Sequence, residues 1–279
     1  MASAGPAPFP PATIGELVDA FEGTLRASLG LVRSLPDAQW ELPTDCPAWT
    51  VRDQVSHLIG VERYLLGEPR PEHVLPALPH VRTDFDRFTE LDVDVRRGRD
   101  PASLCEELAA TLQARLAVLR APTLSLDTPL PSPFGLRPAE WVLRLRTFDC
   151  WMHEQDIRSA VARPGGLDTP AAGLSVAWVR HSLPRVLATS AEAGTTPLLR
   201  LVVDGPHGFD TLLTLGADGR GIDLPASGPG TDGRAPDVTV AMSTEAFMRR
   251  AGGRWSVART DATVTGAGAG RRLAERFLA

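Results

Sequence analysis

The sequence has few cysteines, and those it has stand far apart. Its 279 residues contain three, Cys46, Cys105 and Cys150, with no CxxC pair. A sparse, odd number favours a reducing compartment over a disulfide framework, and structural zinc sites normally use closely paired cysteines. We therefore expect a cytoplasmic protein that is held together neither by disulfides nor by a cysteine-bound zinc ion.

Long hydrophobic runs and an excess of positive charge are also missing. No apolar run approaches the roughly 18 residues of a membrane span, and residues 1–11 lack the basic start and apolar core of a signal peptide. The formal net charge is −5, whereas a nucleic-acid-binding surface requires a basic stripe. The composition thus argues against membrane and nucleic-acid partners and leaves the oligomeric state open.

Helical periodicity dominates the first 190 residues. Thr13 and Thr50 each begin a capping pattern, with Glu16 and Asp53 three residues later. We expect helices at about 13–35, 50–67, 83–95, 101–120, 139–161 and 169–187. Antiparallel packing into a bundle is the natural way to bury their apolar faces, and such bundles build metal sites from side chains on facing helices.

The pattern changes after a small, polar segment at 190–197. Short strand-like runs follow, separated by turn signals such as Gly228-Pro229-Gly230. We expect strands at 198–203, 209–215, 222–224, 237–242 and 262–265, and helices at 244–251 and 270–278. The predicted fold class is α+β, with a disordered tail at 1–12, a helical bundle at 13–190 and a small α+β domain at 197–279.

The stretch 144–158 contains the largest group of candidate functional residues. It contains no Gly or Pro, and an apolar stripe at helical spacing predicts a helix: Trp141, Leu145, Phe148 and Met152. Asp149 and His153, four residues apart, point the same way from neighbouring turns, between Arg146 and Asp156. Such a pair can offer two ligands to one metal ion, or it can be a hydrogen-bonded pair that stabilises the helix.

A third candidate ligand, His57, lies inside the second predicted helix. Its place at the margin of the apolar face is more typical of a hydrogen-bonded histidine at the edge of a core than of a metal ligand. Glu154 is an alternative carboxylate to Asp149, but it points about 100° away from His153 on the helix. Cys150 also points about 100° away from Asp149 around the helix, so the two side chains do not lie on the same face.

Two segments resemble a known family. Residues 45–58, DCPAWTVRDQVSHL, resemble the signature CPGWTVRDLVAHL of the mycothiol-dependent maleylpyruvate isomerase family, whose bundles are DinB-like metal-binding four-helix bundles. Residues 146–158, RTFDCWMHEQDIR, followed by RPGG, are similar to the family's second signature. The C-terminal part looks like the sterol-carrier-protein-like α+β domain that often follows the bundle.

The resemblance implies a divalent metal, most simply Zn2+, held by His57, Asp149 and His153. The family's isomerase is similar but has glutamate at the place of Asp149, which is one methylene shorter. The resemblance also implies mycothiol, an actinobacterial thiol, as cosubstrate, with a metal-bound thiolate attacking an electrophilic small molecule in S-transfer or cis–trans isomerisation. Arg254 is the implied catalytic residue that binds a substrate carboxylate, with Arg249 and Arg250 as rivals.

Further roles and functions stay open. Asp156 can accept the free ring N–H of His153 or form a surface ion pair. Arg144 and Arg146 can bind an anionic substrate or pair with Asp149, although arginine is by default a solvated surface residue. A metal-dependent hydrolase on the same bundle is the first alternative function, with Glu154 or Asp53 as general base. A non-catalytic ligand-binding protein is the second.

Overall fold

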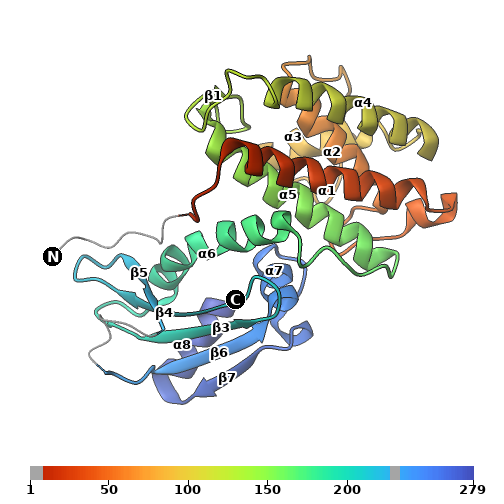
Figure 1. The fold of residues 1–279 in the computed structure, drawn as a ribbon. Helices are drawn as coiled ribbons and strands as arrows, with labels where there is room; N and C mark the ends of the chain where they lie inside the picture. Colours follow the sequence, from red (N-terminus) through yellow and green to blue (C-terminus); the bar gives the residue numbers. More distant parts are fainter. Residues whose placement is uncertain (1–8, 227–232) are drawn as a thin grey trace. The chain divides into compact units, whose positions relative to one another are not determined.

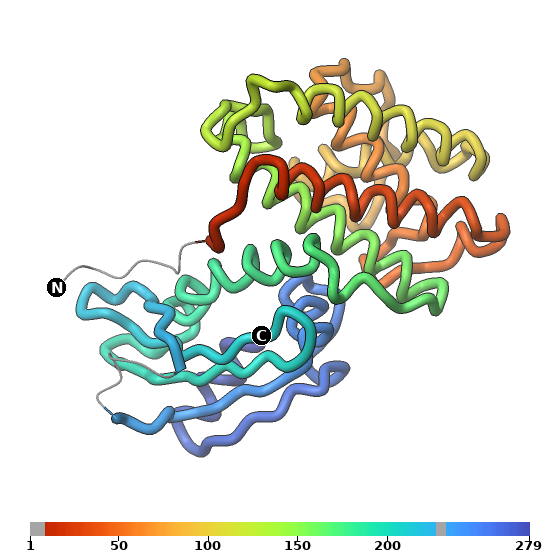
Figure 2. The backbone as a smooth tube through the Cα atoms, in the orientation of Figure 1, coloured from red at the N-terminus to blue at the C-terminus, as the bar shows by residue number. Residues whose placement is uncertain are grey.

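The computed structural model describes residues 9–226 and 233–279, which fold into two compact units (Figures 1 and 2). The helical unit comprises residues 12–175. The sheet unit comprises the described residues from 176 to 279, together with residues 9–11. Within the described residues, no helix has the length and apolar character needed to cross a membrane.

The helical unit is built from five helices and the start of a sixth. They are α1 (Ile14–Arg33), α2 (Val51–Leu65), α3 (Asp84–Asp94), α4 (Pro101–Leu119), α5 (Ala139–Ala160) and α6 (Pro170–Ser190), with a short 3-10 turn at Asp37–Glu41. Capping boxes at Thr13, Thr50 and Thr83 start α1, α2 and α3 because each hydroxyl and its partner carboxylate satisfy otherwise unpaired N–H groups. The predicted helices are therefore confirmed, and their ends differ by a few residues.

The core of this unit lies between four of the helices. α1 packs against α4 and α5, and α2 packs against α3, α4 and α5. Fully buried residues from all four fill the centre, including Phe21, Leu58, Leu108 and Leu143. The helix α3 lies outside α2 and approaches it closely, since a Cβ on Gly60 would come within 2.2 Å of Asp92 Cβ.

Two details of the helical unit differ from the sequence expectation. The loop before α5 contains a two-residue strand pair, β1 (Pro129–Leu130) and β2 (Arg137–Pro138), where we expected no strand. A strand of two residues is too short to show the alternation that predicts one. On α5, most of the expected apolar stripe is only half-buried, and the core is filled instead by Val142, Leu143, Cys150 and Ile157.

The sheet unit contains one five-stranded sheet with the order β5-β4-β3-β6-β7. Its strands are β3 (Leu199–Asp204), β4 (Phe209–Leu215), β5 (Gly221–Pro225), β6 (Val238–Ser243) and β7 (Thr263–Gly266). The pair β3–β6 is parallel and the other pairs are antiparallel. Helices α7 (Thr244–Ala251) and α8 (Gly268–Leu278) pack against these strands, and Val257–Arg259 forms a 3-10 turn. The predicted α+β class is thus confirmed.

The second half of α6 belongs to the sheet unit. Arg180 forms an ion pair with Asp223 of β5 at 3.0 Å, and a Cβ on Gly221 would collide with the carbonyl oxygen of Pro184. The domain limits expected from the sequence, 13–190 and 197–279, remain a prediction, whereas the contacts divide the chain inside α6.

Parts of two expectations, the tail at 1–12 and the turn at 228–230, lie outside the described residues. The described end of the expected tail has a partner, since Phe9 stacks on Trp178 and His181.

Candidate metal centre

The site lies between α2 and α5, which run antiparallel at this point. Gln54 of α2 meets His153 of α5, and Glu62, two turns further along α2, meets Arg146. The Thr50 cap fixes the start of α2, so His57 falls two turns into the helix. Because Asp149 and His153 are four residues apart on α5, both can face the same point on α2.

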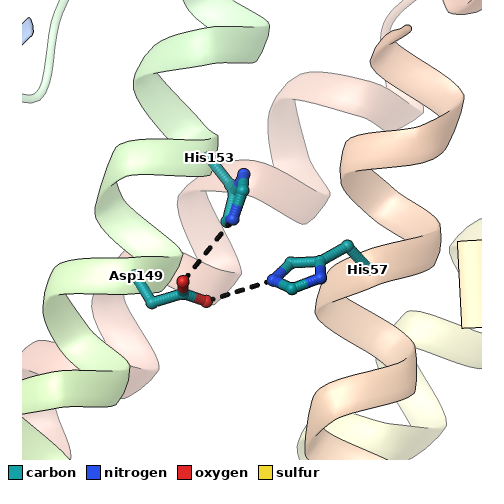
Figure 3. Close-up of side chains that lie close together, drawn as sticks. All are labelled: His57, Asp149 and His153. Atoms are coloured by element: carbon teal, nitrogen blue, oxygen red, sulfur yellow. Dashed lines mark hydrogen bonds and ion pairs between the residues drawn. The ribbon is translucent and has the colours of Figure 1, made fainter. Parts of the chain in front are cut away.

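Three side chains meet there, as Figure 3 shows: His57 from α2, and Asp149 and His153 from α5. One ligand atom from each lies within 4.8 Å of the others. His57 Nε2 is 3.3 Å from Asp149 Oδ2, and His153 Nε2 is 3.6 Å from Asp149 Oδ1. The structure therefore brings together the three residues that the sequence singled out.

The cluster is covered on one side and open at the carboxylate. His57 and His153 are each 5% exposed, whereas the side chain of Asp149 is 29% exposed. The buried Trp49 ring lies over both imidazoles, with centroid distances of 5.0 Å to His57 and 5.9 Å to His153. Its indole N–H is held by Glu90 Oε2 at 2.9 Å. Asp149 is thus the member of the cluster that solvent reaches most.

The charge states suit a cation. Burial, and secondarily the charge of His153, lowers the pKa of His57 to about 4, so that ring is neutral at pH 7. Burial opposes ionisation of Asp149, but the positive charge of Arg146 outweighs it and holds the pKa of this carboxyl well below its usual range. A neutral imidazole and an ionised carboxylate are the forms that bind metal ions.

A buried chain of ion pairs supports Asp149. Arg146 donates to Asp149 Oδ2 at 2.7 Å and, through Nε, to Glu62 Oε1 at 2.7 Å. Arg115 from α4 donates to the other oxygen of Glu62, also at 2.7 Å. Although burial opposes its charge, the Glu62 carboxylate raises the pKa of Arg146 above its ordinary value. The sequence had suggested the Arg146–Asp149 contact but gave no sign of Glu62 or Arg115.

The hydrogen-bond partner of the His153 ring is not Asp156, although accepting this bond was one of the two roles considered for that residue. Gln54 Oε1 is hydrogen-bonded to His153 Nδ1, whereas Asp156 Oδ2 lies 3.7 Å from that atom. Gln54 is fully buried and precedes His57 by three residues. That spacing places it on the same face of α2, and it is the signal by which the sequence could have identified Gln54.

The alternative acids face away from the cluster. Glu154 accepts hydrogen bonds from Thr24 of α1 at 2.6 Å and from Arg158 at 2.8 Å, and burial raises its pKa despite these bonds. Asp53 caps the start of α2 and accepts a hydrogen bond from Arg97 at 3.2 Å. Both carboxylates are therefore already hydrogen-bonded to groups outside the cluster.

The other two candidates on α5, Arg144 and Cys150, also contact groups outside the cluster. The buried Arg144 pairs with Glu140 at 2.8 Å. Cys150 is fully buried beneath Arg146, whose Nη2 lies 3.4 Å from its Sγ, and burial raises the pKa of its thiol well above the usual range. A thiol that stays protonated is a poor nucleophile.

The arginine candidates for substrate binding belong to the sheet unit. Arg254 lies in the turn after α7, is partly exposed, and donates to the carbonyl oxygen of Gly252 at 2.8 Å. Arg249 is buried, and Arg250 donates to the carbonyl oxygen of Leu278 at 2.6 Å. Arg254 is therefore more accessible than Arg249, and its role in binding remains a prediction.

The sequence matches a known protein family, and the structure is similar to solved structures. Residues 21–158 match the family described as the mycothiol maleylpyruvate isomerase N-terminal domain. The crystal structure of a mycothiol-dependent maleylpyruvate isomerase is similar, with a TM-score of 0.51, 16% identity and coverage of 90% of this chain and 92% of that chain. A mutant of such an isomerase gives a TM-score of 0.49 at the same identity and coverage. No curated protein matches the sequence.

Proposed function

Because residues 21–158 belong to the family of mycothiol maleylpyruvate isomerase N-terminal domains, we propose that this chain is a metal-dependent enzyme that uses mycothiol. The proposed reaction is attack by a thiolate on an electrophilic small molecule, ending either in S-transfer or in cis–trans isomerisation. The observation that carries the proposal is the cluster of His57, Asp149 and His153 with its exposed edge at Asp149.

The donor set fits a divalent ion, most simply zinc. Two imidazole nitrogens and one carboxylate, with room for a further ligand, are typical of catalytic rather than structural zinc sites. His57 is neutral and Asp149 is ionised, as ligation requires. A zinc ion held by these residues would lower the pKa of an entering thiol, which makes the thiolate available near neutral pH.

The protein's own residues have positioning and shielding roles in this proposal. Arg146 holds one oxygen of Asp149 and so fixes the orientation of the carboxylate. Trp49 covers the two imidazoles and excludes water from their far side. A thiol and its electrophilic partner then meet at the exposed edge of Asp149.

The nucleophilic sulfur comes from the cosubstrate on this proposal. Cys150 is buried under Arg146, and burial raises the pKa of both Cys150 and Cys105. Cys46 lies in the loop before α2, and its backbone N–H is hydrogen-bonded to the Thr44 hydroxyl. The burial of Cys150 and Cys105 favours an external thiol over a protein thiol.

Arg254 is our candidate for binding a substrate carboxylate. A guanidinium group binds a carboxylate through two parallel hydrogen bonds, and Arg254 is partly exposed whereas Arg249 is buried. Arg254→Met should raise KM for an anionic substrate and leave zinc binding unchanged. Loss of zinc from this variant would contradict the assignment.

The hydrolase alternative is disfavoured by the positions of its candidate bases. Glu154 is bonded to Thr24 and Arg158, and Asp53 to Thr50 and Arg97. Neither is directed at the ligand cluster, and a general base must lie within hydrogen-bond reach of the proton that it takes.

The test is a calorimetric titration of mycothiol into the zinc-loaded and the metal-free protein. We expect binding to the zinc-loaded form and much weaker binding to the metal-free form. An analogue with oxygen in place of sulfur is the matched control and should bind weakly to both. Equal binding of mycothiol to the two forms, or equal binding of the analogue, would contradict a thiol-binding metal site.

A further inference from the structure

The two histidines of the cluster have different partners for their second ring nitrogens. His153 Nδ1 is hydrogen-bonded to Gln54 Oε1. His57 Nδ1 is buried and has no hydrogen-bond partner among the described residues. The protein therefore specifies the protonation of one ring through a direct contact and leaves the other without such a contact.

The contact at His153 is the end of a hydrogen-bonded chain that starts in the loop before α2. Thr44 Oγ1 lies 2.8 Å from the carbonyl oxygen of Trp49. Two oxygen atoms at this distance require a proton between them, and a backbone carbonyl carries none. The Thr44 hydroxyl must therefore donate its single proton to Trp49.

The direction of that bond determines the orientation of the Gln54 amide. The terminal nitrogen of Gln54 lies 2.7 Å from Thr44 Oγ1. Since the hydroxyl proton is already used, Thr44 can only accept from Gln54, so the NH2 group must face the threonine. The amide oxygen then faces His153.

The amide orientation in turn determines where the imidazole proton lies. An amide oxygen can only accept, so His153 must carry its proton on Nδ1. In the neutral ring Nε2 is then unprotonated, and its lone pair points toward Asp149 Oδ1 at 3.6 Å. Asp156 Oδ2 lies 3.7 Å from Nδ1, on the same side of the ring as Gln54.

We propose that Thr44 and Gln54 are positioning residues that fix His153 in the Nδ1-protonated tautomer, so that Nε2 is ready to bind a metal ion before the ion arrives. The relay runs from the Trp49 carbonyl through the Thr44 hydroxyl and the Gln54 amide to the imidazole. Its use in metal binding rests on the proposed function, whereas the tautomer itself is a property of the metal-free protein.

The tautomer can be measured directly by long-range 1H–15N NMR correlation of the histidine rings in the metal-free protein at pH 8. The His153 signals are assigned by their loss in His153→Ala. We expect the wild-type protein to show protonated Nδ1 and unprotonated Nε2 at His153. A wild-type ring protonated on Nε2 would overturn the relay.

Variants along the relay test its direction. Thr44→Val removes the group that anchors the amide, so His153 should become a mixture of both tautomers. Thr44→Ser keeps the hydroxyl and should restore the wild-type pattern. Gln54→Leu removes the acceptor and should also give a mixture. An unchanged tautomer in both Thr44→Val and Gln54→Leu would overturn the proposal.

Zinc affinity gives the second readout. Loss of the hydrogen bond behind a ligating histidine typically weakens metal binding by about 10–100-fold, which we expect for Gln54→Leu, with a smaller loss for Thr44→Val. Gln155→Leu is the matched control, because Gln155 is also buried on these helices but donates to the Gly165 carbonyl at 3.1 Å. It should change neither the tautomer nor the affinity, and an equal loss in this control would contradict a specific relay.

The two proposals fail in different ways. If the wild-type protein has the expected tautomer but binds no zinc, the proposed metal site is wrong and the hydrogen-bonded relay stands. If it binds zinc but His153 is protonated on Nε2 in the metal-free state, the relay is wrong and the metal site stands.

Discussion

The two compact units differ sharply in what they bury. Among the described residues, the helical unit buries ten Asp, Glu and Arg side chains: Asp53, Glu62, Glu90, Asp92, Arg96, Arg115, Arg144, Arg146, Glu154 and Asp156. The described part of the sheet unit buries only two such side chains, those of Arg249 and Asp223, the second of which pairs with Arg180, and its interior is otherwise almost entirely apolar. Buried charge is costly unless it is paired, so stability alone does not explain why one unit concentrates it.

Three of these buried charges connect to the ligand cluster. The chain from Arg115 through Glu62 and Arg146 ends on Asp149, a member of the ligand cluster. Perturbed ionisable groups gather where chemistry needs them. We infer that the helical unit retains this chain of buried ion pairs because it orients Asp149, whereas no comparable chain is found in the described part of the sheet unit.

The largest expected effect comes from breaking the buried chain at Glu62. Glu62→Leu leaves Arg115 and Arg146 buried without their shared partner, and removing one member of a buried pair typically destabilises by about 3–5 kcal/mol. Urea denaturation of the metal-free protein, followed by circular dichroism, measures this loss. The control is Glu41→Leu, which removes a surface partner of Arg52 and should cost less than about 1 kcal/mol. Equal, small losses in both variants would contradict the comparison.

A core substitution in the sheet unit should affect stability without affecting the site. Leu201 is fully buried in the central strand β3, and Leu201→Ala should cost about 2–5 kcal/mol through lost burial and the cavity left behind. The folded fraction should bind zinc with wild-type affinity in equilibrium dialysis. A folded Leu201→Ala protein that has lost zinc binding would show that the two units are not functionally distinct.

Zinc itself should stabilise one unit selectively. At a free concentration of 100 times Kd, a ligand that binds only the folded state stabilises it by about 2.7 kcal/mol. Hydrogen–deuterium exchange should therefore slow in α2 and α5 and remain unchanged in strands β3 and β6. Protection confined to the sheet strands would contradict a site between α2 and α5.

The smallest effect is expected from the cysteines. Burial raises the pKa of Cys150 and Cys105, so both thiols should resist iodoacetamide at pH 8 in the folded protein, whereas the partly exposed Cys46 should react first. Peptide mass spectrometry after timed alkylation measures the order. Labelling of Cys150 before Cys46 would contradict its buried, inactive placement.

Much of the fold could be predicted because its determinants are local. The caps at Thr13 and Thr50 and the helical spacing of apolar residues set the helix limits to within a few positions. The division of the chain inside α6 could not be read in this way. It depends on Arg180 and Gly221 meeting other segments, and such contacts leave no mark on the periodicity of the helix.

The site was partly predictable for a similar reason. Asp149 and His153 are a pair within one helix, so their spacing was informative, whereas His57 joined them through the family resemblance. Gln54, Glu62 and Arg115 were missed because they act across the packing of α2, α4 and α5, and which faces of different helices meet is decided by tertiary packing. Only Gln54 carried a local signal, its spacing of three residues from His57.

The central claim is that His57, Asp149 and His153 form one metal site, and metal analysis after equilibrium dialysis against zinc tests it most directly. The dialysis should include the wild type, His57→Ala and His153→Ala, with Glu154→Gln as the control because Glu154 neighbours His153 but faces Thr24. Circular dichroism should confirm that each variant is folded. We predict one zinc ion per chain in the wild type and the control, and none in the two alanine variants. Full occupancy in both alanine variants, or no zinc in the wild type, would contradict the claim.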